Sequence, residues 1–164
     1  MLFTGHSEHT IDPKQRLAIP ARYRNQWSAE RDGGAWFCIP WPTGHLRLYT
    51  ENTFAQMARQ GEMSLTPDQV TAELEASLYG FAERLEMDAA GRITIPRQHL
   101  EMTGLTNDVV VVGAGNRLEV RSKLDWQASA MDRFKSLPDL VQRVQQSRMT
   151  PPPPQPPPRG GPFQ

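Results

Sequence analysis

The sequence of 164 residues contains one cysteine, carries no net charge and has no long apolar run. A single cysteine excludes an intramolecular disulfide and favours a reducing compartment. Cys38 lies between Phe37 and Ile39, and we expect it to be a small buried side chain rather than a nucleophile. No stretch reaches the roughly 20 apolar residues of a transmembrane helix, and residues 1–10 do not resemble a signal peptide. We therefore expect a soluble cytoplasmic protein with no membrane partner.

The neutral total charge conceals an uneven distribution along the chain. Lysine and arginine together number 18, as do aspartate and glutamate, so the whole chain gives no indication of a polyanionic partner. Residues 14–24 nevertheless contain four cations and no acid, namely Lys14, Arg16, Arg22 and Arg24. Residues 51–88 contain eight acids and only two arginines. The pattern predicts a basic face on an otherwise acidic body. The acids are expected on a solvated helix face, with contact to a neighbouring subunit's basic loop as the alternative.

One short motif occurs twice, and a repeat of this kind has to be found before the fold is assigned. Residues 12–20 read Asp-Pro-Lys-Gln-Arg-Leu-Ala-Ile-Pro, and residues 88–96 read Asp-Ala-Ala-Gly-Arg-Ile-Thr-Ile-Pro. In both copies an Asp is followed four positions later by Arg, then by two alternating apolar residues and a Pro. The two copies predict one structural unit present twice.

Each residue of the motif has a physical reason. The Asp, helped by Pro13 in the first copy, suits a type I turn, and Gly91 suits the positive φ of a hairpin loop. The apolar residues alternate as the buried face of a strand does, which places Arg16 and Arg92 on the opposite, outward face. The final Pro cannot continue a strand but fits the first turn of a helix. Each copy therefore predicts a strand, a turn carrying an outward Arg, a second strand and a helix.

Further elements follow from hydrophobic periodicity and from breaker residues. Strands are expected at residues 3–11, 35–39, 46–49, 81–87, 109–112 and 117–121. Helices are expected at residues 21–27, around residues 54–58, at residues 66–80 with Thr66 as the cap, and at residues 96–102. A helix from Ser122 is expected to stop at Pro138 and to be followed by a short last helix. Residues 28–34 are expected to be a polar loop, and residues 40–44 a turn.

The C-terminal segment has a biased composition. From Thr150 it reads Pro-Pro-Pro-Pro-Gln-Pro-Pro-Pro-Arg-Gly-Gly-Pro-Phe-Gln, which can form polyproline II but cannot bury a core. A ligand for an aromatic-lined groove and a solvated tail without a partner are both compatible with this composition, and the second is favoured. We predict a disordered tail over residues 148–164.

The chain resembles the MraZ family over about residues 1–145. The resemblance lies in residues 6–20, His-Ser-Glu-His-Thr-Ile-Asp-Pro-Lys-Gln-Arg-Leu-Ala-Ile-Pro, in the second motif at residues 88–96, and in residues 112–120, Val-Gly-Ala-Gly-Asn-Arg-Leu-Glu-Val. Two copies in the right order, followed by the family's hairpin, are fairly specific, whereas one Asp-x-x-Gly-Arg sequence would be weak.

This resemblance implies an α+β fold with flanking helices. It implies two tandem AbrB-like (SpoVT-type) swapped-hairpin β-barrel modules that pack as an internal pseudo-dimer. The expected division is a first module at residues 1–64, a linking helix at residues 65–80, and a second module with C-terminal helices at residues 81–147.

The resemblance also implies a function. Members of this family are bacterial transcriptional regulators of the division and cell-wall gene cluster. They form ring-shaped oligomers and bind direct repeats in promoter DNA through the Asp-x-x-Gly-Arg loops. The implied DNA-binding residues are Lys14, Arg16 and Arg92, with Arg22 and Arg97 as weaker candidates, and the implied turn residues are Asp12, Gln15, Asp88 and Gly91. A nucleoid-associated location follows from that role.

Two positions depart from the family pattern. Gln15 stands where the family usually has Gly, and a left-handed φ there would cost on the order of 1 kcal/mol, so we expect the loop to adjust instead. The second loop has Ala89 and Ala90, and it therefore lacks a counterpart of Lys14. We expect the two loops to contribute unequally to DNA binding.

Structural explanations exist for several candidate residues. Arg16 and Arg92 could simply pair with Asp12 and Asp88, which contributes about 0–1 kcal/mol at an exposed site, although pairing and DNA contact are compatible. His6 and His9 should point to opposite faces of a strand, which makes a shared metal ion improbable. The aromatic residues Trp36, Trp41, Trp126 and Phe134 are expected in the core or at subunit contacts.

The motifs give no indication of catalysis. We find no Ser/His/Asp grouping, no phosphate-binding glycine loop and no Cys/His metal set, and we expect no enzyme activity, cofactor or metal. Two alternatives to a DNA-binding regulator remain. One is a degenerate family member that acts as an oligomeric protein-interaction module, and the other is an antitoxin, for which the C-terminal tail is too poor in apolar residues.

Overall fold

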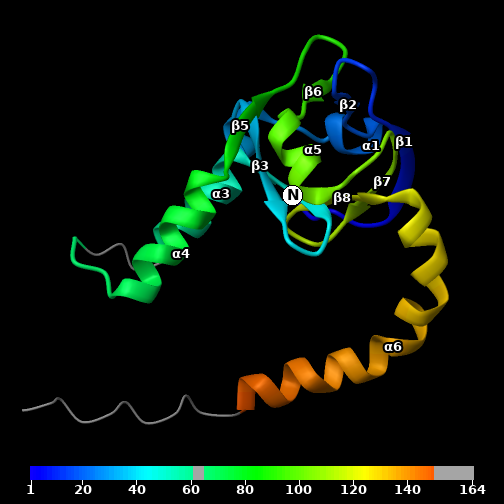
Figure 1. The fold of residues 1–164 in the computed structure, drawn as a ribbon. Helices are drawn as coiled ribbons and strands as arrows, with labels where there is room; N and C mark the ends of the chain where they lie inside the picture. Colours follow the sequence, from blue (N-terminus) through cyan, green and yellow to red (C-terminus); the bar gives the residue numbers. More distant parts are fainter. Residues whose placement is uncertain (61–64, 150–164) are drawn as a thin grey trace, which may run out of the picture. The chain divides into compact units, whose positions relative to one another are not determined.

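The computed structural model describes residues 1–60 and 65–149 (Figure 1). Fourteen elements are assigned within these residues. The strands are β1 (His6–Thr10), β2 (Arg16–Ala18), β3 (Ala35–Trp41), β4 (His45–Thr50), β5 (Glu83–Glu86), β6 (Arg92–Thr94), β7 (Asp108–Gly113) and β8 (Leu118–Ser122). The helices are α1 (Ala21–Arg24), α2 (Ala29–Asp32), α3 (Glu51–Gln60), α4 (Gln69–Gly80), α5 (Arg97–Thr103) and α6 (Lys123–Met149).

Backbone contacts divide the chain into two compact units, Met1–Ala128 and Ser129–Gln164. The first unit contains every strand of the described residues, so both motif copies belong to it. The second unit consists, in its described part, of the C-terminal portion of α6. The predicted disordered tail lies outside the described residues from residue 150 onward, whereas Arg148 and Met149 still belong to α6.

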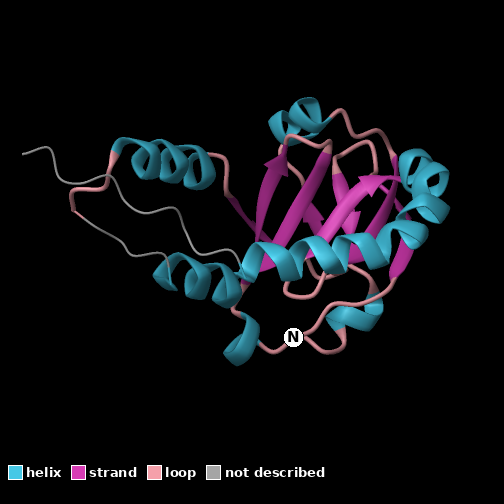
Figure 2. Ribbon diagram, turned by 90° about the horizontal axis from the view of Figure 1, so that it is seen from below, coloured by secondary structure: helices cyan, strands magenta, loops and turns pink. Residues whose placement is uncertain are grey.

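Strands from the two halves of the sequence are interleaved in one antiparallel sheet. Its order is β1-β7-β8-β4-β3-β5, and β2 pairs with β6 in a separate two-stranded ribbon. Figure 1 labels β2 and β6 beside each other, and Figure 2 shows the strands in magenta. Exchanging β1 with β5, β3 with β7 and β4 with β8 reproduces the same order read from the other end. The sheet therefore has internal two-fold pseudosymmetry, in which β1 pairs only with β7 of the second half and β5 pairs only with β3 of the first half.

The pseudosymmetry axis is marked by two residue pairs. Leu17 pairs with Ile93 at the centre of the β2–β6 ribbon, and Arg47 pairs with Glu119 at the centre of the β4–β8 ladder. Leu17 and Ile93 are fully buried, which confirms the predicted inward face of both motif copies. The structure is α+β with a mostly antiparallel sheet, and the α+β class agrees with the expectation from the family resemblance.

The core of the first unit is filled from the strands of both halves. Its largest fully buried side chains include Trp36, Phe3 and Leu48, and Cys38 is also fully buried, as expected. Burial and the neighbouring carboxylate of Glu83 raise the pKa of the Cys38 thiol, so this cysteine stays protonated. The Nδ1 atom of buried His99 lies 3.4 Å from Cys38 Sγ. A protonated, enclosed thiol is inert, which agrees with the structural interpretation of this residue.

Three local predictions about the first half of the chain were wrong. The helix after Pro20 ends at Arg24 rather than at residue 27, and the expected polar loop contains α2. This helix forms because the Asp32 carboxylate, 1% exposed, accepts a 2.9 Å hydrogen bond from the Ser28 N–H and pairs with Arg31. Pro40 lies inside β3 instead of in a turn. The ladder to β5 covers only Ala35–Cys38, so Pro40 lies where β3 is an edge strand and needs no donor on that side.

Two helix boundaries also differ from prediction. Asp68, not Thr66, caps α4, because its Oδ1 accepts a 3.1 Å hydrogen bond from the Thr71 N–H while its Oδ2 accepts one of 2.6 Å from the Thr71 hydroxyl. The C-terminal helix is a single α6 that continues through Pro138, without the predicted interruption and second helix. Proline removes one backbone donor, and on an exposed helix water can satisfy the carbonyl that is left over.

Helix α4 carries apolar side chains that stay largely exposed in the described part of the chain. Val70 is 76% exposed and Leu74 is 61% exposed, and α4 has no buried residue. A cavity of about 600 Å³ lies beside this helix. It is lined by Ile39, Pro40, Trp41, Pro42, Leu74, Ser77, Leu78, Phe81 and Met102. Within residues 1–60 and 65–149, no helix is long and apolar enough to cross a membrane.

Candidate nucleic-acid interface

Each motif copy forms a loop that is closed by its own aspartate. In the first loop, Asp12 Oδ1 accepts hydrogen bonds from the backbone N–H groups of Lys14 and Arg16, both at 2.9 Å. In the second loop, Asp88 Oδ1 accepts the equivalent bonds from Ala90 at 2.9 Å and from Arg92 at 3.0 Å. The two loops thus have the same internal geometry, and each depends on a carboxylate at the first position.

The same carboxylates hold the side chains of the two motif arginines. Arg16 Nε lies 2.7 Å from Asp12 Oδ2, and Arg92 Nε lies 2.8 Å from Asp88 Oδ2. The arginine side chains remain 30% and 35% exposed. Hydrogen bonds lower the pKa of both carboxyls, chiefly the bond from the Arg16 N–H at Asp12 and that from the Arg92 side chain at Asp88. The aspartates are therefore ionised at neutral pH, and each keeps its arginine in one orientation.

The β2–β6 ribbon brings the two loops together. Arg16 pairs with Thr94 and Arg92 pairs with Ala18, so both arginines stand on the ribbon face opposite the buried Leu17 and Ile93. Two residues along a strand span about 7 Å and paired strands lie about 5 Å apart, which puts the two arginine backbones about 8 Å apart. The predicted outward orientation of both side chains is confirmed.

Hydrogen bonds that cross between the motif copies fix this arrangement. The Ile95 N–H donates to the carbonyl of Gln15 at 2.9 Å, and the Ile19 N–H donates to the carbonyl of Gly91 at 3.0 Å. The residue at the fourth position of each loop, Gln15 or Gly91, thus accepts a hydrogen bond from the isoleucine that follows the strand after the other loop. The two loops form one rigid surface rather than two independent ones.

Gln15 adopts the backbone conformation that the sequence interpretation expected the loop to avoid. Its φ is 63°, and it is the only residue other than glycine with a positive φ in the described residues. Gly91 occupies the equivalent position with φ of 73°. The loop cannot adjust because its backbone is closed on Asp12 at one side and on Ile95 at the other.

Replacing this residue with glycine should stabilise the protein. We expect Gln15→Gly to raise the free energy of unfolding by about 0.5–1 kcal/mol, since relief of left-handed strain exceeds the added entropy of the unfolded chain. Urea unfolding of the full chain measures the change. The matched control is Ala90→Gly at a position without positive φ, which should lower the stability. A lower unfolding midpoint for Gln15→Gly would contradict the assigned strain.

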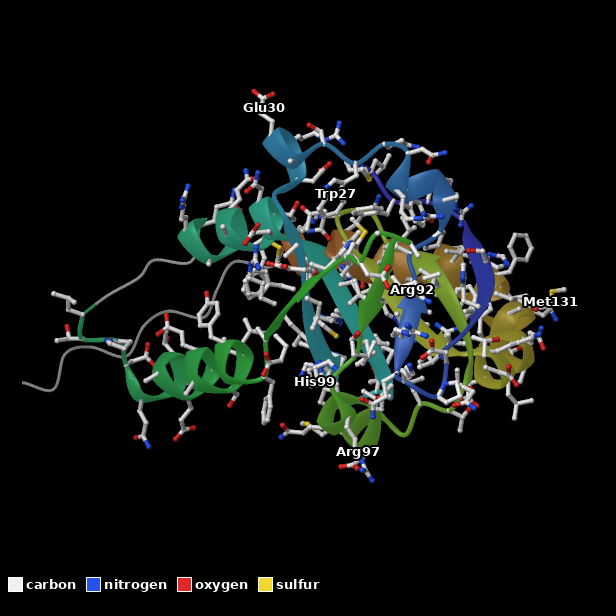
Figure 3. All side chains as sticks on the ribbon, turned by 90° about the horizontal axis from the view of Figure 1, so that it is seen from above. Trp27, Glu30, Arg92, Arg97, His99 and Met131 are labelled. Carbon is white, nitrogen blue, oxygen red and sulfur yellow. The ribbon has the colours of Figure 1, made fainter. Side chains whose placement is uncertain are left out.

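The other predicted DNA-binding residues lie in different places. Lys14 is exposed at the tip of the first loop. The guanidinium of Arg22 lies 4.7 Å from the centroid of the Tyr23 ring and close to Gly5. Arg97 is 80% exposed, pairs with Glu101 at 2.8 Å, and projects from α5 well away from Arg92 (Figure 3). The geometry therefore groups Lys14, Arg16 and Arg92.

Sequence reasoning counted Arg24 in the basic stretch of residues 14–24 but did not place it beside the second loop or among the DNA-binding candidates. Arg24 Nε donates to the carbonyl of Ile19 at 2.9 Å, and its Nη1 donates to the carbonyl of Ala90 at 3.3 Å. The side chain crosses directly over Gly91. Aligning the two motifs could have drawn attention to it, because the position four residues after the Pro is Arg24 in one copy and Leu100 in the other.

A second charged cluster surrounds the other end of the pseudosymmetry axis. Glu119 is 5% exposed and accepts hydrogen bonds from Arg117 at 2.7 Å and from Arg121 at 2.6 Å. His45 Nε2 lies 3.8 Å from the same carboxylate, and Arg47 stacks on the Trp41 ring at 3.5 Å. Every acid and base of this cluster has a partner, so it is suited to holding strands β4 and β8 together. Among the described residues no group of three His, Cys, Asp or Glu side chains could hold a metal ion.

The fold and the loops define a class: an internally duplicated α+β protein that presents two equivalent arginine-bearing loops side by side. The chain belongs to the MraZ family. The family model described as "MraZ protein, putative antitoxin-like" matches residues 2–75 and again residues 78–144.

Three relatives illustrate the family. Proteins named "Transcriptional regulator MraZ" are 32% identical in Coxiella burnetii (131 residues, 80% of this chain and 86% of the relative) and 33% identical in Chromobacterium violaceum (141 residues, 85% and 95%). A third, in Nitratidesulfovibrio vulgaris, is 27% identical over 149 residues, which cover 90% of this chain and 96% of the relative. Similarity therefore extends over at least four fifths of this chain and of each of these relatives.

Proposed function

We propose that this protein is a transcriptional regulator that binds promoter DNA through its two Asp-x-x-(Gly/Gln)-Arg loops. The observation that carries the proposal is the placement of Arg16 and Arg92 on one face of the β2–β6 ribbon, each held by an aspartate. Its relatives are named transcriptional regulators, which supports a DNA-binding role and gives no reason to expect catalysis. A nucleoid-associated location follows from the proposal.

The chemistry of the ribbon suits duplex DNA. Arginine can donate two hydrogen bonds to O6 and N7 of guanine, and a two-stranded ribbon can enter the major groove. The separation of about 8 Å between the arginines corresponds to two or three base steps of about 3.4 Å. Lys14 is placed to contact a phosphate beside them. In this proposal the arginines select the sequence while the lysine contributes affinity.

We further propose that the two halves are AbrB-like swapped-hairpin modules. The exchange of β1 and β5 between the halves of the sheet supports this interpretation. The modules would comprise residues 1–64 and 81–147, with residues 65–80 as the linking helix. The promoters implied by the family resemblance are those of the division and cell-wall gene cluster, with direct repeats as the target.

One chain offers two reading loops, which is too few for high specificity. We propose that a ring-shaped homo-oligomer repeats them along the promoter, because linked weak contacts gain from effective concentration. The exposed apolar residues of α4 and the cavity lined by Trp41, Phe81 and Met102 are suited to subunit contacts. Direct repeats in the DNA would then match repeated subunits in the ring.

The test is a gel-shift with DNA from upstream of the protein's own gene, combined with mass measurement in solution. We expect binding to that DNA over unrelated DNA, and a steep loss of affinity between 50 and 200 mM salt, since log K should fall by roughly 0.9 per phosphate contact for each tenfold increase in salt concentration. An oligomer of defined size that shows no preference for the promoter would reject the proposal and favour a protein-interaction module.

A further inference from the structure

We infer that Arg24 is the phosphate-binding cation of the second loop and takes there the part that Lys14 takes in the first. The inference rests on the proposed function and goes beyond it, because Arg24 lies outside the motif of that loop and belongs to the other half of the chain.

The two loops differ in net charge. In the first loop Arg16 is neutralised by Asp12, and Lys14 adds one positive charge. In the second loop Arg92 is neutralised by Asp88, and the position equivalent to Lys14 is Ala90. The second motif alone is therefore neutral. A loop without net charge gains nothing from the counterion release that drives association with DNA.

The guanidinium of Arg24 lies against the second loop. Its Nη1 donates to the carbonyl of Ala90, the residue that stands in the lysine's position. Its Nε donates to the carbonyl of Ile19, the residue directly after β2. Both partners are uncharged carbonyls, and no carboxylate within the described ranges forms an ion pair with Arg24. The positive charge of Arg24 is thus held against the second loop without being neutralised.

Gly91 allows the Arg24 side chain to approach the backbone of the second loop closely. A Cβ atom at position 91 would lie 2.3 Å from Arg24 Cδ and 2.6 Å from its Nη1, so only glycine leaves room for the side chain to cross. In the other half, Leu100 stands where Arg24 does, and it packs against the core. There the equivalent of Gly91 is Gln15. Each loop therefore obtains one unneutralised cation, Lys14 from the loop itself or Arg24 from α1 of the other half.

The experiment uses the full-length protein and the promoter DNA of the gel-shift, with affinity measured at several salt concentrations. We expect Arg24→Ala to weaken binding about tenfold at low salt. The steepness of log K against log salt should fall by about 1 for each subunit whose Asp88–Arg92 loop contacts the DNA. The exposed Arg59 on α3 supplies the matched control, because Arg59→Ala removes an arginine remote from the loops. Should Arg24→Ala not fold, Arg24→Gln removes the charge and retains a donor for the Ala90 carbonyl.

A rescue separates charge from structural support. Adding Ala90→Lys to Arg24→Ala places a lysine where the first loop has one, and it should restore the salt slope and most of the affinity. A variant that merely loosened the loop would not recover in this way. Arg24→Ala with an unchanged slope, or a slope that Ala90→Lys fails to restore, overturns the inference. Absence of promoter binding by the wild-type protein, in contrast, would reject the proposed function itself.

Discussion

A variant with both Arg16→Ala and Arg92→Ala is expected to lose promoter binding by at least a hundredfold while keeping its fold. Each arginine that donates two hydrogen bonds to a guanine contributes about 1–3 kcal/mol of discrimination, and both would be lost. Because the two loops share one rigid ribbon, loss of one arginine should weaken every contact that depends on the same docking geometry. The double variant should therefore bind promoter and unrelated DNA with the same low affinity.

The fold should survive because the loops do not depend on the arginine side chains. Asp12 Oδ1 and Asp88 Oδ1 bond to backbone N–H groups, which alanine retains. The lost ion pairs are partly exposed and contribute about 0–1 kcal/mol each. Circular dichroism and solution mass should match the wild type.

The comparison is a titration of promoter DNA with wild type, double variant and Arg59→Ala. Arg59 lies on α3, outside the loops, so its variant should bind as the wild type does. If the double variant kept its affinity and its preference for the promoter, another surface would have to read the DNA, and the assignment of the loops would fail.

The free energy of unfolding should begin to fall at a higher pH than protonation of carboxylates alone would explain. Burial, followed by the charge of Arg121, lowers the pKa of His45 to about 4. The buried imidazole therefore stays neutral, and its Nε2 accepts a 3.4 Å hydrogen bond from Arg47 Nε. In the unfolded chain the same histidine titrates near 6.5.

The sign follows from proton counting. Between pH 6.5 and about 4 the unfolded state binds a proton at His45 that the folded state does not, so the free energy of unfolding falls as pH falls through this range. The loss approaches roughly 3 kcal/mol at the acid end. Burial also lowers the pKa values of His9 and His99, and both add to the slope. Glu119 has a lowered pKa as well, but its contribution disappears only below about pH 4.3.

Urea unfolding at pH 7.5, 6, 5 and 4.5 tests this prediction. His45→Gln does not titrate, so its stability should depend less on pH even if the variant is weaker at pH 7.5. His6→Gln, which replaces an exposed histidine, serves as the control for the loss of one imidazole. Equal slopes for wild type and His45→Gln would show that folding does not lower the pKa of His45.

The motif was predictable because its structure depends on neighbouring residues. Features that depend on contacts between distant parts of the chain were not predictable. The turn, the outward arginines and the buried Leu17 and Ile93 depend on residues only a few positions apart. Arg24, in contrast, meets Ala90 across 66 positions. Glu119 stands at an alternating strand position that predicts an exposed carboxylate, yet His45, Arg117 and Arg121 enclose it.

The sequence by itself determined the duplication, the α+β class, the two Asp-to-Arg loops and the family. These follow from residue spacing, because turns, alternation and helix caps act within a few residues. Only the tertiary structure decided in which order the strands of the two halves are interleaved in one sheet, that Gln15 takes a positive φ, and that Arg24 lies over Gly91. Each of these depends on which distant segments pair, and pairing is set by burial of the common core and closure of the cross-strand hydrogen bonds.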